Sequence, residues 1–162
     1  IGGGLPIGAI GGSRAVMENL TPIGKVFHAG TLAGNPLATA AGLAALNELT
    51  QDVYMELGAR ARALSTLLRD ACLSAGIVAQ FPVVGTLVGA FFGPNTPTNF
   101  DEAKQTDEKM YARLFHAMLA EGVALAPGAY EALFVGLGHT DSVMQQLAER
   151  TERAAHAAVR AQ

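Results

Sequence analysis

Residues 25–38, with the sequence KVFHAGTLAGNPLA, constrain the fold of this chain more than any other stretch. Three pairs of residues there have strong backbone preferences: Val26 and Phe27, Gly30 and Gly34, and Asn35 and Pro36. The first pair favours a β-strand, and the glycines allow backbone angles that other residues resist. The last pair is a favoured N-cap followed by a proline at the first helical position. The stretch therefore predicts a short buried strand, a tight turn and the start of a helix.

The predicted helix start is suited to bind an anion. Unpaired N–H groups and the positive end of the helix dipole favour a phosphate at such a position. Thr31 adds a hydroxyl donor between the two glycines. Two interpretations follow from these residues alone: a phosphate-binding turn, or a well-capped strand-to-helix connection without a ligand, which is common in folded domains.

Composition limits the class of protein. The 162 residues suffice for one domain, or for part of one domain plus a smaller one. Half of them are hydrophobic and 15% are charged, which predicts a sizeable core. A net charge of −3 without a basic run argues against nucleic-acid or anionic-membrane partners. No apolar run is clean and long enough to span a bilayer.

Two further features concern the origin of the chain. The single cysteine, Cys72, cannot form an internal disulfide, which fits a reducing cytoplasm. The chain opens without methionine on the glycine-rich stretch Ile1–Gly8, which has the character of the interior of a folded region. We therefore expect a cytoplasmic protein and a fragment of a longer polypeptide.

Apolar periodicity and turn residues predict alternating helices and short strands. Helices are expected over 14–19, 36–49 and 52–75, then from a cap at Asp107 to Glu121 and from a cap at Thr140 to about Arg160. Strands are expected over 7–10, 77–81, 86–92, 123–126 and 133–137. The helix over 36–49 is apolar on nearly all sides, as is typical of a buried helix. This order of elements predicts an α/β or α+β unit.

Candidate catalytic groups are sparse. The four histidines are far apart in the sequence, and with one cysteine they make no metal-ligand cluster, so no metal is expected. Each of the three lysines stands in a polar or turn context, unlike the desolvated amine that Schiff-base chemistry needs. Glu131 lies in a loop before a strand, where it either faces a cleft or is simply exposed. The residues alone predict an anion-binding turn and no complete catalytic set.

Several blocks of the sequence resemble a known family. Residues 2–9, GGGLPIGA, resemble the segment just after the cofactor lysine of class III aminotransferases, which depend on pyridoxal 5′-phosphate. Within that class, four blocks are similar to the glutamate-1-semialdehyde 2,1-aminomutase family: residues 29–38, 98–103, 115–119 and 125–132. Because the blocks occur in the right order over essentially the whole chain, the resemblance is to the C-terminal part of that family.

The resemblance implies a fold, an activity and a cofactor. The fold is α/β of fold-type I, with residues 1–52 as the end of the large cofactor-binding domain and residues 53–162 as the small C-terminal α+β domain. The activity is intramolecular amino transfer, which converts glutamate-1-semialdehyde to 5-aminolevulinate for tetrapyrrole (porphyrin) synthesis. The cofactor is pyridoxal 5′-phosphate, which acts as the electron sink while the protein holds it.

The resemblance also implies site residues and partners. The threonine matching Thr31 reaches from one subunit to the cofactor phosphate of the other, and Gly30 shapes that turn. This implies a homodimer with shared active sites. The glutamate matching Glu131 lies near the small-molecule substrate.

One departure from the family pattern is large. The Schiff-base lysine falls two positions before Ile1, so the chain holds no catalytic residue of that kind. Its other implied partner is therefore the missing N-terminal half of the same protein, and we predict that the 162-residue chain alone is inactive. Two other functions stay open: another class III aminotransferase that moves an amino group between two molecules, or a non-catalytic interaction module.

Overall fold

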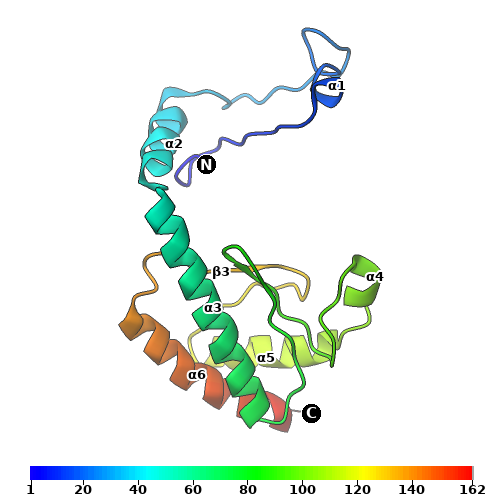
Figure 1. Cartoon of the computed structure of the whole chain (residues 1–162), viewed down its shortest axis with the longest axis vertical. Coiled ribbons are helices and arrows are strands. Elements are labelled where there is room, and N and C mark those ends of the chain that lie inside the picture. The colour runs from blue at the N-terminus through cyan, green and yellow to red at the C-terminus, as the bar shows by residue number, and fades with distance from the viewer. Residues whose placement is uncertain (162) are drawn as a thin grey trace. The chain divides into compact units, whose positions relative to one another are not determined.

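The structure is a computed structural model that describes residues 1–161 (Figure 1). The chain divides into two compact units, Ile1–Val53 and Tyr54–Gln162. This division falls one residue from the predicted domain boundary. That the first unit is the end of a cofactor-binding domain stays a prediction.

The first unit consists of two helices and long connecting segments. Helix α1 spans Arg14–Met17 and helix α2 spans Pro36–Glu48. The N-cap of α2 is as predicted, because the Asn35 side chain accepts a hydrogen bond from the Ala38 N–H at 3.0 Å. Ser13 precedes α1 without a side-chain cap.

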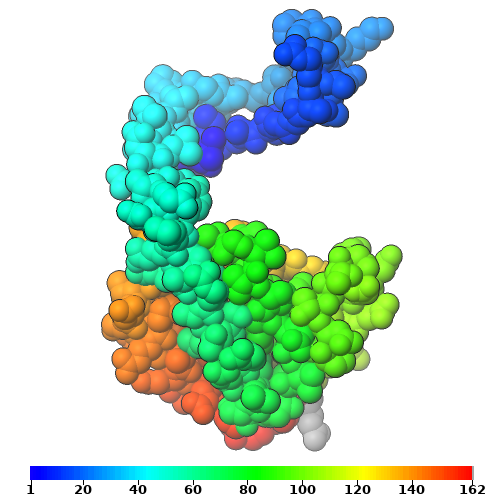
Figure 2. Space-filling view, viewed as in Figure 1, coloured from blue at the N-terminus to red at the C-terminus, as the bar shows by residue number. Residues whose placement is uncertain are grey.

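Three expectations for the first unit are wrong. No strand forms at residues 7–10, and the predicted strand at Val26 is reduced to one bridge with Leu20. Phe27 is not buried but 80% exposed. Helix α2, cyan in Figure 2, also presents all three of its leucines to solvent. The physical reason is the same in each case: a strand needs a partner edge and an all-round apolar helix needs neighbours, and the described residues of this unit supply neither.

The second unit is built from a long helix, a small sheet and two further main helices. Helix α3 spans Gln51–Ser74, α5 spans Glu108–Ala120, and α6 spans Asp141–Arg160; a short α4 covers Phe100–Ala103. Asp107 and Thr140 cap α5 and α6 as predicted. The sequence patterns identified these three long helices correctly, α5 and α6 from their caps and α3 from its apolar stripe.

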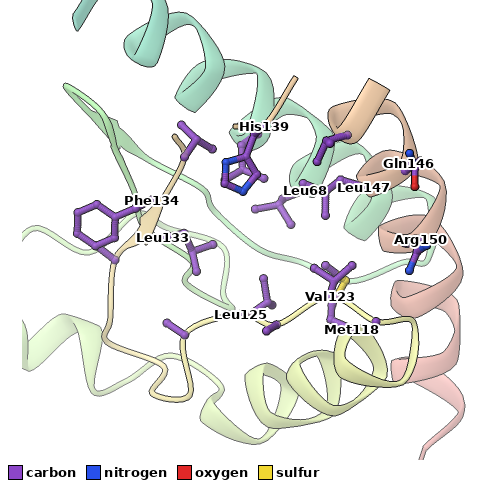
Figure 3. A pocket seen from close by; sticks show the side chains of 17 residues that line it. Leu68, Met118, Val123, Leu125, Leu133, Phe134, His139, Gln146, Leu147 and Arg150 are labelled. Carbon is purple, nitrogen blue, oxygen red and sulfur yellow. The ribbon is translucent and has the colours of Figure 1, made fainter. Parts of the chain in front are cut away.

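The sheet is smaller than predicted. Strands β1 (Val83–Val84), β2 (Leu87–Val88) and β3 (Leu133–Phe134) are antiparallel in the order β1-β2-β3. Gly85, at φ +61°, makes the turn between β1 and β2. The predicted strand over 123–126 does not form. Its residues instead border an open pocket between α3, β3 and α6 (Figure 3).

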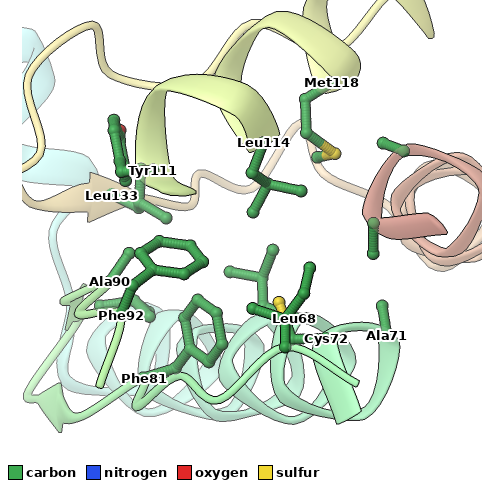
Figure 4. Close-up of a cluster of buried hydrophobic side chains, with 14 of the residues drawn as sticks. Leu68, Ala71, Cys72, Phe81, Ala90, Phe92, Tyr111, Leu114, Met118 and Leu133 are labelled. Carbon is green, nitrogen blue, oxygen red and sulfur yellow. The ribbon is translucent and has the colours of Figure 1, made fainter. Parts of the chain in front are cut away.

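The hydrophobic core of the second unit lies between the helices and the sheet (Figure 4). Leu68 from α3 and Leu114 and Met118 from α5 are almost fully buried there. Phe92 makes edge-to-face contacts with Phe81 and with Tyr111, with ring centroids 6.3 and 5.9 Å apart. Since each main helix turns its apolar stripe inward, this unit has a core of its own. No helix within residues 1–161 is long and apolar enough to cross a membrane.

Candidate functional site: an open turn before helix α2

The turn that leads into α2 is held by its own backbone. The Ala33 N–H donates to the Gly30 carbonyl at 3.0 Å. Asn35 then closes the turn, because its backbone N–H and its side-chain amide both donate to the Leu32 carbonyl, at 3.3 and 2.8 Å. Gly34, at φ +73°, adopts a left-handed conformation, one of the backbone angles that glycine allows and other residues resist.

Gly30 differs from Gly34. Its φ is not in the left-handed region, and a Cβ at this position would meet only the Ala33 Cβ at an ordinary 3.6 Å. The expectation that both glycines are needed for backbone angle is therefore wrong for Gly30. A small residue here instead leaves open space beside Thr31, which is useful where a ligand approaches the backbone closely.

Thr31 is exposed, and its polar groups are available. Within residues 1–161, neither the Thr31 hydroxyl nor the N–H groups of residues 30–32 donate a hydrogen bond to the protein. Three N–H groups and a hydroxyl at the entry to a 13-residue helix are donors suited to a phosphate. Thr39, one turn further on, differs because its hydroxyl already donates to the Asn35 and Pro36 carbonyls.

The second candidate, Glu131, lies in the other unit. Its side chain is exposed and Oε1 accepts a hydrogen bond from the Gly128 N–H at 2.8 Å, which fixes a tight turn. Thr31 belongs to the first unit and Glu131 to the second.

Two tyrosines that the sequence analysis did not single out anchor the Glu131 loop. The Tyr111 hydroxyl donates to the Ala126 carbonyl at 2.5 Å, and the Tyr130 hydroxyl donates to the Glu108 carboxylate. Burial, together with the nearby Glu131 carboxylate, raises the pKa of Tyr111. The hydrogen bond to Glu108 raises the pKa of Tyr130. The sequence signal was weak, because Tyr111 occupies an ordinary apolar position of α5.

The expectations for Cys72 and for the three lysines agree with the structure. Cys72 is 1% exposed in the core, and its burial raises the pKa of the thiol to about 12, as expected for a structural rather than reactive cysteine. The three lysines, Lys25, Lys104 and Lys109, are exposed. Among residues 1–161, no group of three His, Cys, Asp or Glu side chains is placed to hold a metal ion.

Comparisons with known proteins place the chain in a family. Residues 1–153 match the family model described as aminotransferase class-III. A glutamate-1-semialdehyde 2,1-aminomutase from Desulfosudis oleivorans is 45% identical over 158 residues, which cover 97% of this chain and 36% of that protein. The chain thus spans about a third of the length of the curated relatives it matches.

Solved structures agree on the fold. An omega-transaminase from Sphaerobacter thermophilus superposes with a TM-score of 0.73 at 24% identity, over 94% of this chain and 36% of that one. A glutamate-1-semialdehyde-aminomutase variant from Pseudomonas aeruginosa in complex with PMP superposes with a TM-score of 0.67 at 23% identity, over 81% and 30%. The predicted fold class, α/β of fold-type I, is confirmed. The chain belongs to the class-III aminotransferase family.

Proposed function

We propose that this chain is part of a pyridoxal 5′-phosphate-dependent aminomutase that converts glutamate-1-semialdehyde to 5-aminolevulinate. Relatives named for this enzyme are 39–49% identical over most of the chain, which supports the assignment. Because the chain spans about a third of those relatives, we assign the activity to the complete protein and not to the 162 residues alone. We place that protein in tetrapyrrole synthesis in the cytoplasm.

We propose that Thr31 and Gly30 hold the cofactor phosphate. The observation that supports this is the open turn that leads into α2: within residues 1–161, the exposed Thr31 hydroxyl and three N–H groups have no protein acceptor. The donor set fits a phosphate, which takes hydrogen bonds from such groups at helix N-termini. When bound, the cofactor supplies the electron sink for amino transfer. Thr31 contributes orientation, and Gly30 keeps the approach clear.

We further propose a homodimer with shared sites. In it, the turn of one protomer serves the cofactor of its partner. A turn whose donors point to solvent within its own unit is compatible with an acceptor supplied from outside that unit. We assign Glu131 a place near the substrate, on a loop that Tyr111 and Tyr130 hold in position.

Thr31→Val in the complete enzyme tests the phosphate assignment. Removing a hydrogen bond to a charged group costs about 1.5–3 kcal/mol, so we expect the dissociation constant for pyridoxal 5′-phosphate to rise roughly tenfold to hundredfold. Thr39→Val is the matched control, because it removes an exposed hydroxyl near the same helix start that is already bonded to the backbone. Equal cofactor affinity in the two variants would refute the assignment.

A second assay tests the reaction type. We expect the complete enzyme to convert glutamate-1-semialdehyde to 5-aminolevulinate without an added amino donor, since the amino group moves within one skeleton. A strict requirement for a separate amino donor would instead identify an intermolecular aminotransferase. No turnover under either condition, with cofactor bound, would favour a non-catalytic module.

A further inference from the structure

The second unit contains a pocket that the proposed site residues do not line. Its volume is about 640 Å³, within the range of small-molecule sites. It lies between α3, β3, α6 and the extended segment 123–126, and all 17 of its lining residues belong to the second unit. Thr31 and Glu131 are not among them.

The wall of the pocket is apolar. In Figure 3 the side chains of Leu68, Met118, Val123, Leu125 and Leu133 point into the hollow from different elements. Residues 123–126 form no strand against β3, and all four line the pocket. A cavity with this lining favours a hydrocarbon or aromatic tail over a polar molecule.

One cation stands on the border of this apolar pocket. Arg150 projects from α6, beside Gln146 (Figure 3), and it is half-buried. One of its guanidinium nitrogens, Nη1, donates to the Glu121 carbonyl at 2.6 Å, which fixes the side chain in place. The fork geometry of a guanidinium leaves further N–H groups for a second acceptor.

Arg150 also lacks a counter-charge. Within residues 1–161 no carboxylate lies within ion-pair distance of its guanidinium. The carboxylate of Glu121, the residue whose carbonyl Arg150 contacts, is paired with Arg153 on the next turn of α6, at 2.8 Å. A half-buried cation without an acidic partner is complementary to an anionic ligand, and a guanidinium matches a carboxylate with two hydrogen bonds.

We propose that this pocket binds a small monocarboxylate with an apolar tail. The carboxylate accepts hydrogen bonds from Arg150, with Gln146 as a neighbouring amide donor. The tail lies along Val123, Leu125 and Leu133. The His139 ring serves as part of the wall, because its Nδ1 already accepts a hydrogen bond from the Gly136 N–H at 3.0 Å. The proposal does not depend on the proposed aminomutase function.

Calorimetric titration of the 162-residue chain with sodium octanoate tests the proposal. We expect saturable binding at one site, and at least tenfold weaker binding of octan-1-ol, which has the same tail without the charge. Absence of saturable octanoate binding would overturn the proposal. Equal affinity for acid and alcohol would overturn it as well, since Arg150 would then play no part.

Variants make the test specific. Arg150→Gln should weaken octanoate binding roughly tenfold to hundredfold, and Arg150→Lys, which keeps the charge, should restore part of it. Arg160→Gln is the matched control from the same helix, because it removes an exposed cation that does not line the pocket. Leu147→Trp should abolish binding of both compounds by filling the hollow. Equal losses in Arg150→Gln and Arg160→Gln would overturn the proposal, because the effect would then be one of general charge.

Discussion

Thr151 in α6 offers a sharp test of the packing of the second unit. Its side chain is fully buried, yet within residues 1–161 its hydroxyl has no hydrogen-bond partner. A buried hydroxyl without a partner costs about 1–3 kcal/mol. Valine has nearly the same shape and a similar helix propensity, so Thr151→Val removes this cost without creating a cavity. We expect the free energy of unfolding to rise by about 1–2 kcal/mol.

Two further variants separate the effect of the Thr151 hydroxyl on the free energy of unfolding from the general effect of substituting a threonine. Thr151→Ser keeps the hydroxyl and removes a buried methyl group, so it should lower the free energy of unfolding by about 1 kcal/mol. Thr66→Val, at an exposed position of α3, should change it by less than about 0.5 kcal/mol. The expected order of stability is therefore valine, threonine, serine at position 151.

Urea unfolding followed by tyrosine fluorescence is a suitable assay. The chain has no tryptophan, and its three tyrosines, at positions 54, 111 and 130, all belong to the second unit. The signal therefore reports on that unit alone, and a shift of the midpoint at constant slope measures stability. A Thr151→Val variant that is less stable than the parent chain would refute the reasoning, because the hydroxyl would then have an acceptor in solution.

Three further predictions concern the same unit. Burial raises the pKa of Cys72 from 9.0 to about 12, so above pH 9 the folded state keeps a proton that the unfolded state loses. The free energy of unfolding should therefore fall by about 1.4 kcal/mol per pH unit above pH 9. Cys72→Ala should remove this slope in urea titrations followed by circular dichroism at pH 8–10. Asp107→Ala deletes the acceptor for the Met110 N–H and should cost about 1 kcal/mol of unfolding free energy in the same assay; an unchanged midpoint would exclude the cap. Tyr111→Phe removes the donor to the Ala126 carbonyl and should cost about 1–3 kcal/mol, with faster proteolysis of the Glu131 loop as the independent readout; unchanged cleavage would contradict the anchoring role.

Local signals in the sequence predicted the helices well. Asn35, Asp107 and Thr140 each cap a helix as expected. In each case the side-chain oxygen accepts a hydrogen bond from the N–H three residues later, a local contact that does not depend on the rest of the fold. The apolar stripe of α3 was also predicted, because Ala61, Leu64 and Leu68 follow one another at helical spacing and so share one face.

Strand pairing and burial were less predictable, because they depend on residues far away in the chain. Val26 and Phe27 have strand propensity, but a strand forms only where another edge accepts its hydrogen bonds. Residues 123–126 likewise remain extended without joining β3. The local sequence pattern does not predict which strand, if any, will pair with such a segment.

The sequence indicated Thr31 and the N-terminus of α2 as an anion-binding turn. Within residues 1–161, the Thr31 hydroxyl and the N–H groups of residues 30–32 donate to no protein acceptor, whereas the Ala38 N–H at the helix start is bonded to the Asn35 side chain. That the turn binds an anion stays a prediction from the sequence. The sequence did not predict that Gly34 alone would need the left-handed backbone, nor that Tyr111 and Tyr130 would anchor the Glu131 loop. Both depend on distances between groups that sequence spacing does not specify.

The central claim is that Thr31 of one protomer serves the cofactor of its partner, and subunit mixing tests it most directly. Complete enzyme carrying Thr31→Val is mixed with enzyme whose Schiff-base lysine, expected upstream of Ile1, is replaced by alanine. If Thr31 acts across the interface, each mixed dimer has one site with both groups intact. We then predict that the activity per mixed dimer is about half of the activity of the dimer without substitutions. If the mixture is no more active than the two variants measured separately, the claim is contradicted, because Thr31 would then serve its own protomer.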